Sequence, residues 1–175
     1  MDFSDILSFL SGRSSVREYE SEPIPKEEID YILNCASTAP SAGNIEAWDV
    51  VVVTDEETRA ALAEAAFNQT HIEQAPVILA VCSNYVRSMS RYGERGILYA
   101  LEDATIACTY MMLAAHARNL QSCWTGAFDD EAVREVLGLP QHIRPIALLA
   151  IGKGQTPGQL TGRMAVGEHV HRETW

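Results

Sequence analysis

The stretch from Ile97 to Asn119 constrains the fold more than any other part of this chain. Apolar and small residues cover nearly its whole circumference, and the few interruptions are Glu102, Asp103, His116 and Arg118. A helix that is apolar on most sides must be buried on most sides. The adjacent Glu102 and Asp103 argue against a membrane span, because charged side chains are costly inside a bilayer. In a chain of 175 residues one sheet would leave a flank of this helix uncovered, so we predict a homodimer.

Chain length and charge limit both the architecture and the partners. Residues 1–175 are enough for one domain with a substantial core. The formal net charge of −11, from 13 Lys and Arg against 24 Asp and Glu, argues against nucleic acid and anionic membranes as partners. The first residues are acidic where a signal peptide is basic, so we predict a cytoplasmic protein. The scattered cysteines are predicted to be buried thiols: Cys35, Cys82, Cys108 and Cys123.

Shorter patterns on both sides of the long helix predict alternating helices and strands. Helices are expected over residues 3–12, 26–39, 56–66 and 129–137. Apolar, β-branched runs predict buried strands over residues 48–54, 76–82, 122–125 and 146–151. Residues 84–95 are polar, and we expect an exposed loop or a frayed helix there. The expected class is therefore α+β, in a single domain.

Two polar segments point to a bound anion. Guanidinium forks match phosphate geometry and hydroxyls add short hydrogen bonds, so Arg13-Ser14-Ser15-Val16-Arg17 predicts an anion pocket. Arginines of this kind are more often solvated ion-pair partners when they occur alone. The second segment, Pro40-Ser41-Ala42-Gly43-Asn44, is by itself a common turn sequence. Neither segment is specific for a cofactor by itself, and both become informative only when further segments of the chain are considered with them.

Taken together, these segments resemble the nitroreductase family of FMN-dependent oxidoreductases from Arg13 to Trp175. The other matching segments are Trp48, Phe67-Asn68, Ala75-Pro76, Leu113-Ala114-Ala115-His116-Ala117, Ser122-Cys123-Trp124-Thr125-Gly126 and Arg163. Each is a weak indicator alone, whereas their order and spacing together are specific. The resemblance implies a three-layer α+β fold with a central mixed or antiparallel sheet flanked by helices. It also implies an intertwined homodimer with FMN sites at the subunit interface.

The resemblance assigns the basic residues to two parts of the cofactor. Arg13 and Ser15 match positions that hold the FMN phosphate and ribityl chain, and Arg163 matches a second phosphate-binding cation. Arg17 matches the basic residue beside the pyrimidine edge of the flavin. A cation there stabilises the reduced ring, which is anionic around N1 and O2. Ser14 belongs to the same candidate set without an assigned contact.

The ring end of the cofactor is assigned in the same way. Asn68 and His71 match positions at the pyrimidine rim, and the backbone N–H groups of Thr125 and Gly126 match positions facing flavin N5 and O4. A further set matches residues that reach the flavin from the partner subunit: Pro40, Ser41 and Asn44.

The implied function is that of an NAD(P)H-dependent FMN oxidoreductase. It would pass reducing equivalents by a ping-pong mechanism to an electron-poor acceptor of the nitroaromatic, quinone or flavin type. FMN performs the redox step, so no catalytic acid or base is predicted. One alternative is flavin fragmentation or dehalogenation on the same fold, for which residues 84–95 are the candidate lid. The other is a non-enzymatic flavin-binding electron carrier.

Two positions depart from the family pattern. Many relatives have a Gln-Pro-Trp-like triplet where this chain has Glu46-Ala47-Trp48, and we expect the Glu46 carboxylate to face solvent. A Lys that contacts the flavin in some relatives is replaced by His71, whose hydrogen bonding would vary with pH. His169 and His171 could share one face of a strand, but no third ligand lies at metal-binding spacing. No metal site is predicted.

Overall fold

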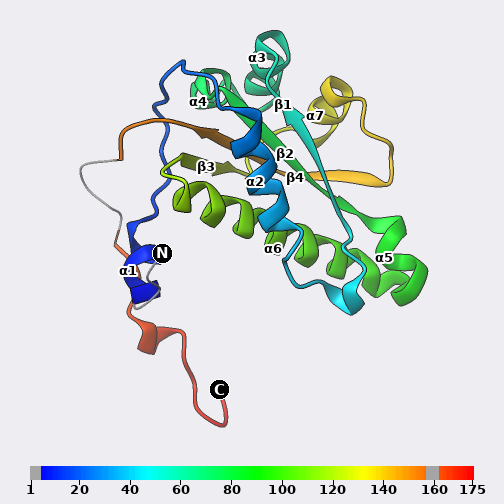
Figure 1. Cartoon of the computed structure of the whole chain (residues 1–175). Helices are drawn as coiled ribbons and strands as arrows, with labels where there is room; N and C mark the ends of the chain where they lie inside the picture. The colour runs from blue at the N-terminus through cyan, green and yellow to red at the C-terminus, as the bar shows by residue number, and fades with distance from the viewer. Residues whose placement is uncertain (1–4, 157–161) are drawn as a thin grey trace.

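Within residues 5–156 and 162–175, which the computed structural model describes, the strands form a four-stranded antiparallel sheet. The strand order is β1-β2-β4-β3, so β1 and β3 are the two edges (Figure 1). The strands are β1 (Trp48–Val53), β2 (Val77–Asn84), β3 (Gln121–Thr125) and β4 (Ile143–Gly152). Each predicted strand is therefore present, and the sheet is antiparallel throughout.

Helices cover both faces of this sheet and give the three layers expected from the sequence. One face packs against α2 (Lys26–Ala36) and the long α6 (Gly96–Ala117). The other face packs against α3 (Glu56–Ala65), α4 (Thr70–Gln74) and α7 (Asp130–Leu137), as Figure 1 shows. The remaining helical segments are α1 (Ile6–Gly12), η2 (Ala42–Asn44), α5 (Tyr85–Tyr92), η3 (Gly93–Arg95) and η4 (Val166–Glu168).

The central strands alternate between the two cores because successive side chains point to opposite faces of a sheet. In β2, Leu79 and Val81 belong to the core under α2 and α6. Ile78 and Ala80 between them belong to the core under α3 and α7. All four are fully buried, and each large apolar side chain so placed contributes about 1.5–3 kcal/mol. Burial on both faces is the reason why β2 is apolar without alternation in the sequence.

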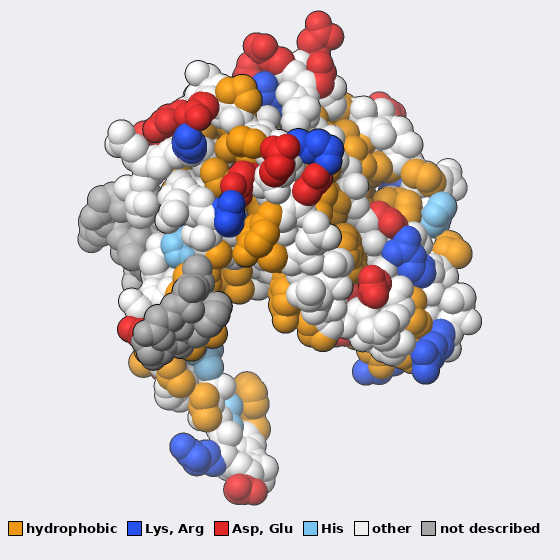
Figure 2. Space-filling model, viewed as in Figure 1, with side chains coloured by type: hydrophobic (Ala, Val, Ile, Leu, Met, Phe, Trp, Pro, Cys, Tyr) orange, Lys and Arg blue, Asp and Glu red, His pale blue; other side chains and the backbone are white. Residues whose placement is uncertain are grey.

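The long helix α6 has one apolar flank that the protomer leaves uncovered, as the sequence argument anticipated. Ala104, Cys108 and Met111 are fully buried against α2 and the sheet, whereas Ile97, Leu98 and Leu101 are each at least 40% exposed. The helical stretch Tyr85–Ala117 is long and apolar enough to cross a membrane by length and composition alone. Its packing on the sheet instead makes it a core helix with an apolar flank exposed in the protomer. Hydrophobic side chains gather along the lower side of the body in Figure 2.

The two chain ends also present apolar side chains that the protomer does not cover. In α1, Ile6 is 60% and Leu7 is 72% exposed. The C-terminal tail leaves the body of the protomer (Figure 1), with Val166 and Trp175 exposed. The predicted N-terminal helix was expected over residues 3–12, of which residues 3 and 4 lie outside the described part.

Of the two structures expected for residues 84–95, an exposed loop or a frayed helix, the helix is present, as α5 and η3, and the Asn84 side chain caps α5 by accepting a hydrogen bond from Arg87 N at 3.1 Å. One strand differs from the sequence expectation. Strand β4 begins at Ile143 and passes through Pro145, where the expectation placed its start at residue 146. A register shift between Val81 and Cys82 leaves Ile146 without a partner residue beside Pro145. Such a bulge tolerates a proline, which lacks the N–H of a regular ladder.

Candidate functional site

The Arg/Ser segment, residues 13–17, lies alongside β3 and contacts it near the start of the strand. Val16 N donates to Ser122 O at 3.1 Å, and Ser15 forms a parallel bridge with Ser122. The Val16 side chain is fully buried and holds the segment against the sheet. The immediate neighbours of Val16, Ser15 and Arg17, therefore point away from the core.

The side chains of this segment are arranged as a site for an anion. Arg13 is half-buried and Arg17 is exposed, and among residues 5–156 and 162–175 neither guanidinium has an ion-pair partner. The Ser14 hydroxyl is buried and has no hydrogen-bond partner within the described structure. A buried polar atom without a partner costs free energy unless a ligand satisfies it. This cluster fits the phosphate that the family resemblance implies.

The Cys123 thiol lies near both arginines and near Thr125, which belongs to the ring end of the predicted site. Burial raises the pKa of its thiol, and the nearby charges of Arg17 and Arg13, together with a hydrogen bond to Thr125, oppose that rise. The parallel bridge of Ser15 with Ser122 directs Arg17 along β3 toward Thr125 and Gly126. The structure therefore brings the Arg/Ser segment and these residues together along the edge strand β3.

His71 and Thr125 form a buried contact within this group. The Nε2 atom of His71, on α4, lies 2.8 Å from the Thr125 hydroxyl, and both residues are at most 4% exposed. The pKa of His71 is lowered, first by burial and then by the positive charge of Arg17. Asn68 precedes α4 and adopts a left-handed backbone with φ +61°. His71 is thus a neutral residue at neutral pH, rather than a substitute cation for the lysine of relatives.

The lowered pKa of His71 predicts a pH-dependent stability. Below about pH 6.5 the unfolded chain binds a proton at His71 that the folded protein does not, so stability falls as pH falls. The loss is at most about 1.4 kcal/mol per pH unit until the folded pKa is reached. In urea unfolding at pH 7.5 and 5.5, His71→Gln should lose less stability than wild type. An identical loss in both proteins would contradict the buried, neutral assignment.

Segment 40–44 lies far from the Arg/Ser segment in the same protomer. Ala42 N donates to Asp103 Oδ1 at 2.8 Å, in the N-terminal half of α6. At the other end of α6, His116 Nε2 lies 3.0 Å from the Phe9 carbonyl of α1, which leads into residues 13–17. Asp103 and His116 are about 20 Å apart along the helix axis at 1.5 Å per residue. One protomer therefore does not bring Pro40, Ser41 and Asn44 to the residues predicted to hold the phosphate.

Some predicted residues lie outside this assembly. Arg163 is exposed on the tail, and no described contact links it to Arg13. Glu46 is half-buried with φ +52°, and its backbone, rather than its carboxylate, makes the observed hydrogen bonds. Within the described residues no group of His, Cys, Asp or Glu is arranged to hold a metal. His171 instead stacks on Trp175 with ring centroids 4.2 Å apart.

The arginines of residues 84–95 are bound to the protein rather than free to form a charged lid. Arg87 donates to the carbonyl groups of Glu46 and Trp48 and pairs with Asp49 at 2.8 Å. Arg91 donates to Gly43 O at 3.2 Å. These bonds hold segment 43–49 against α5, which sequence reasoning missed because nothing local in the sequence links the two.

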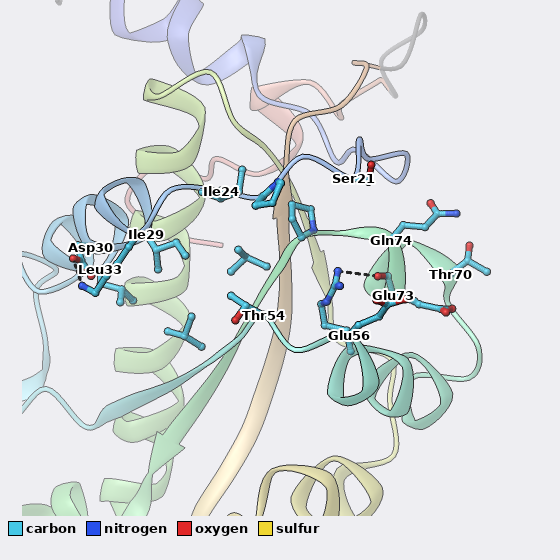
Figure 3. A pocket seen from close by; sticks show the side chains of 16 residues that line it. Ser21, Ile24, Ile29, Asp30, Leu33, Thr54, Glu56, Thr70, Glu73 and Gln74 are labelled. Atoms are coloured by element: carbon cyan, nitrogen blue, oxygen red, sulfur yellow. Dashed lines mark hydrogen bonds and ion pairs between the residues drawn. The ribbon is translucent and has the colours of Figure 1, made fainter.

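A groove on another part of the protomer is separate from the candidate site. A groove of about 1000 Å³ opens between α2, the ends of β1 and β2, and α3 with α4 (Figure 3). Ile29 and Val52 line its apolar side, and Arg59 donates to Glu73 O on its polar side at 3.1 Å. None of the predicted flavin-binding residues is among those described as lining it. The cofactor hypothesis therefore rests on the Arg/Ser segment and the end of β3, not on this groove.

Comparisons with known proteins agree with the architecture and the motifs. The profile described as Nitroreductase family matches residues 10–74 and 65–153. A protein of Thermus thermophilus named NADH dehydrogenase is 33% identical over 87% of this chain and 88% of its own length. FMN reductase [NAD(P)H] of Bacillus subtilis is 27% identical over 98% of this chain and 75% of its own. The structure of B. megaterium NfrA2 superposes with a TM-score of 0.90 at 26% identity, covering 97% of this chain and 74% of that one. This chain belongs to the nitroreductase family.

Proposed function

We propose that this protein is an FMN-dependent oxidoreductase that transfers reducing equivalents from NAD(P)H to an electron-poor acceptor. Relatives named FMN reductase [NAD(P)H] and NAD(P)H nitroreductase support this activity. The observation that carries the proposal is the anion site at residues 13–17, with its arginines unpaired in the described structure and the buried Ser14 hydroxyl unsatisfied. The acceptor we propose is a nitroaromatic, a quinone or a flavin, and we propose the cytoplasm as the location. The single domain spans residues 1–175.

The phosphate of FMN would be held by Arg13, Ser14 and Ser15, with Arg163 as a second cation. Arg13 is half-buried and has no ion-pair partner in the described structure, so its guanidinium can donate without first breaking an ion pair. A bidentate donor of this kind gives both affinity and orientation. The Ser14 hydroxyl gains the partner that it lacks in the protomer.

The ring end would be oriented by Arg17 and the end of β3. When bound, FMN supplies the redox chemistry, taking reducing equivalents from the nicotinamide and passing them to the acceptor. Arg17 would place positive charge at the pyrimidine edge, and Asn68 would donate to the same rim. His71 fixes the Thr125 side chain, and Thr125 and Gly126 would offer backbone N–H groups to the ring. These residues orient the ring and set its electrostatics.

The rest of the site would come from a second copy of the chain. Pro40, Ser41 and Asn44 lie at the opposite end of α6 from the Arg/Ser segment, and the exposed apolar flank of α6 supports a dimer. A twofold axis perpendicular to α6 and passing through that flank would bring one end of each protomer to the other end of its partner. We therefore propose a homodimer with FMN between the subunits.

Spectroscopy of the purified protein tests the function. We expect yellow protein with a flavin absorption spectrum, bleached anaerobically by NADH or NADPH, and parallel double-reciprocal plots with a quinone acceptor. Titration with each nicotinamide then identifies the preferred donor. Colourless protein that neither binds added FMN nor oxidises NAD(P)H would contradict the proposal. Tight FMN binding without turnover of small acceptors would favour the electron-carrier alternative.

A further inference from the structure

Asp103 is a fully embedded carboxylate to which the family resemblance assigns no role. It is 1% exposed, in the middle of the otherwise apolar α6. Burial of a carboxylate is costly unless hydrogen bonds compensate for the lost water. The hydrogen bonds that compensate for the burial of Asp103 all come from one segment, Ser41 to Ala47.

Both oxygens of Asp103 accept hydrogen bonds from this segment. Oδ1 accepts from Ala42 N at 2.8 Å, and Oδ2 accepts from Ala47 N at 3.1 Å. An ionised carboxylate is an acceptor on both oxygens, so it suits two N–H donors. Asp103 therefore ties both ends of segment 41–47 to the same point on a rigid helix.

Two backbone carbonyl groups of the same segment accept hydrogen bonds from arginines of α5. Arg87 donates to Glu46 O, and Arg91 donates to Gly43 O. The carbonyl groups are thus bound by cations while the N–H groups are bound by an anion. The segment is suspended between two helices by charge-assisted bonds, which are stronger than neutral ones.

The backbone of the segment needs this support. Gly43, Asn44 and Glu46 all have positive φ, at 57°, 57° and 52°. Non-glycine residues in this region are strained and persist only where the surroundings hold them. A Cβ on Gly43 would come within 2.2 Å of the Tyr92 hydroxyl. External bonds, and not local propensity, therefore determine this conformation.

The same bonds leave polar groups available for a ligand. Ser41 Oγ accepts from Glu46 N at 3.0 Å, which leaves its own O–H free to donate. Asn44 is exposed, and its side chain makes no hydrogen bond within the described structure. We propose that Asp103 is a positioning residue that fixes segment 41–47, and with it Ser41 and Asn44, for contact with FMN bound by the partner subunit. The inference rests on the proposed function.

Asp103→Asn tests this role with little change in side-chain volume. An amide has only one acceptor oxygen, so its NH2 group must face the N–H of either Ala42 or Ala47. We expect faster hydrogen exchange of amides 42–47, at least tenfold weaker FMN binding by equilibrium dialysis of the holoenzyme, and an altered visible spectrum of the bound flavin. Asp55→Asn is the matched control, because Asp55 also accepts a backbone N–H, from Thr58 at 2.9 Å, but caps α3 away from this segment. It should leave FMN affinity and spectrum unchanged.

The outcomes separate the two proposals. Folded Asp103→Asn with faster exchange at 42–47 but wild-type FMN affinity and spectrum would overturn the positioning role and leave the proposed function intact. Wild-type protein that binds no FMN would contradict the proposed function instead. If Asp103→Asn does not fold, Arg87→Gln provides the second test of whether a fixed segment 41–47 is needed for FMN binding. This variant removes the hydrogen bond from α5 to Glu46 O and so loosens the same segment. It should weaken FMN binding in the same direction, and an unchanged affinity would equally overturn the inference.

Discussion

Arg13→Ala is expected to weaken FMN binding by about one to two orders of magnitude while the reduction potential of the bound flavin changes little. A hydrogen bond to a charged group contributes about 1.5–3 kcal/mol, and each 1.4 kcal/mol is a factor of ten in affinity. Arg13 is half-buried and unpaired within the described residues, so no competing ion pair reduces that loss. Equilibrium dialysis of FMN and redox titration of the holoenzyme measure the two quantities separately.

Arg17→Ala should give the reverse result. Removing a cation beside the pyrimidine edge destabilises the reduced flavin, so the reduction potential should become more negative, by about 30 mV for each 1.4 kcal/mol lost in a two-electron couple. Affinity for oxidised FMN should change less than in Arg13→Ala. Arg144→Ala is the charge-matched control, since Arg144 pairs with Asp130 at 2.8 Å on α7. If both Arg13→Ala and Arg17→Ala weaken affinity equally and leave the potential unchanged, the division between phosphate and ring is wrong.

The fold could be predicted largely because its strongest signals are local. The apolar circumference of α6 and the continuous apolar runs of β2 and β4 each report burial on more than one side. The predicted start of β4 at residue 146 was three residues too late, because the pairing of β4 with β2 continues through Pro145 to Ile143. The bulge opposite Cys82 is a property of two strands and has no signature in either one.

The candidate site shows the same contrast between features that are visible locally in the sequence and contacts that form only in the folded chain. The Arg/Ser segment predicted an anion pocket from its residue types and Thr125 was named only through the family resemblance, whereas their approach to each other depends on the pairing of Val16 with Ser122. His71 was predicted to respond to pH, and its burial against Thr125 lowers its pKa. Asp103 was understood only as an interruption of an apolar helix. Its two bonds to residues about sixty positions earlier could not be inferred from spacing.

Mixed dimers should restore FMN binding that each parent variant lacks. Arg13→Ala removes the phosphate-binding guanidinium, and Gly43→Val disrupts segment 40–44, because a side chain there would meet the Tyr92 hydroxyl at 2.2 Å with φ at +57°. If the two parts of a site come from different subunits, a dimer of one Arg13→Ala chain and one Gly43→Val chain contains one intact site and one doubly altered site. At an FMN concentration well below the dissociation constants of the two variants, FMN content should therefore rise from near zero in both homodimers to about half of the wild-type value.

The reciprocal dimer distinguishes this arrangement from a site built within one chain. When both substitutions are placed on one chain and paired with wild type, sites shared between subunits are each altered once, so FMN content should stay near that of the single variants. A site contained in one chain predicts the opposite pattern: the wild-type subunit would keep its FMN, and the dimer of the two single variants would bind none. Differently tagged chains, co-expressed and purified through both tags, provide the two dimers, and flavin absorbance against protein gives the content. Because the Arg/Ser segment and Ala42 adjoin opposite ends of α6, we expect the pattern of sites shared between subunits.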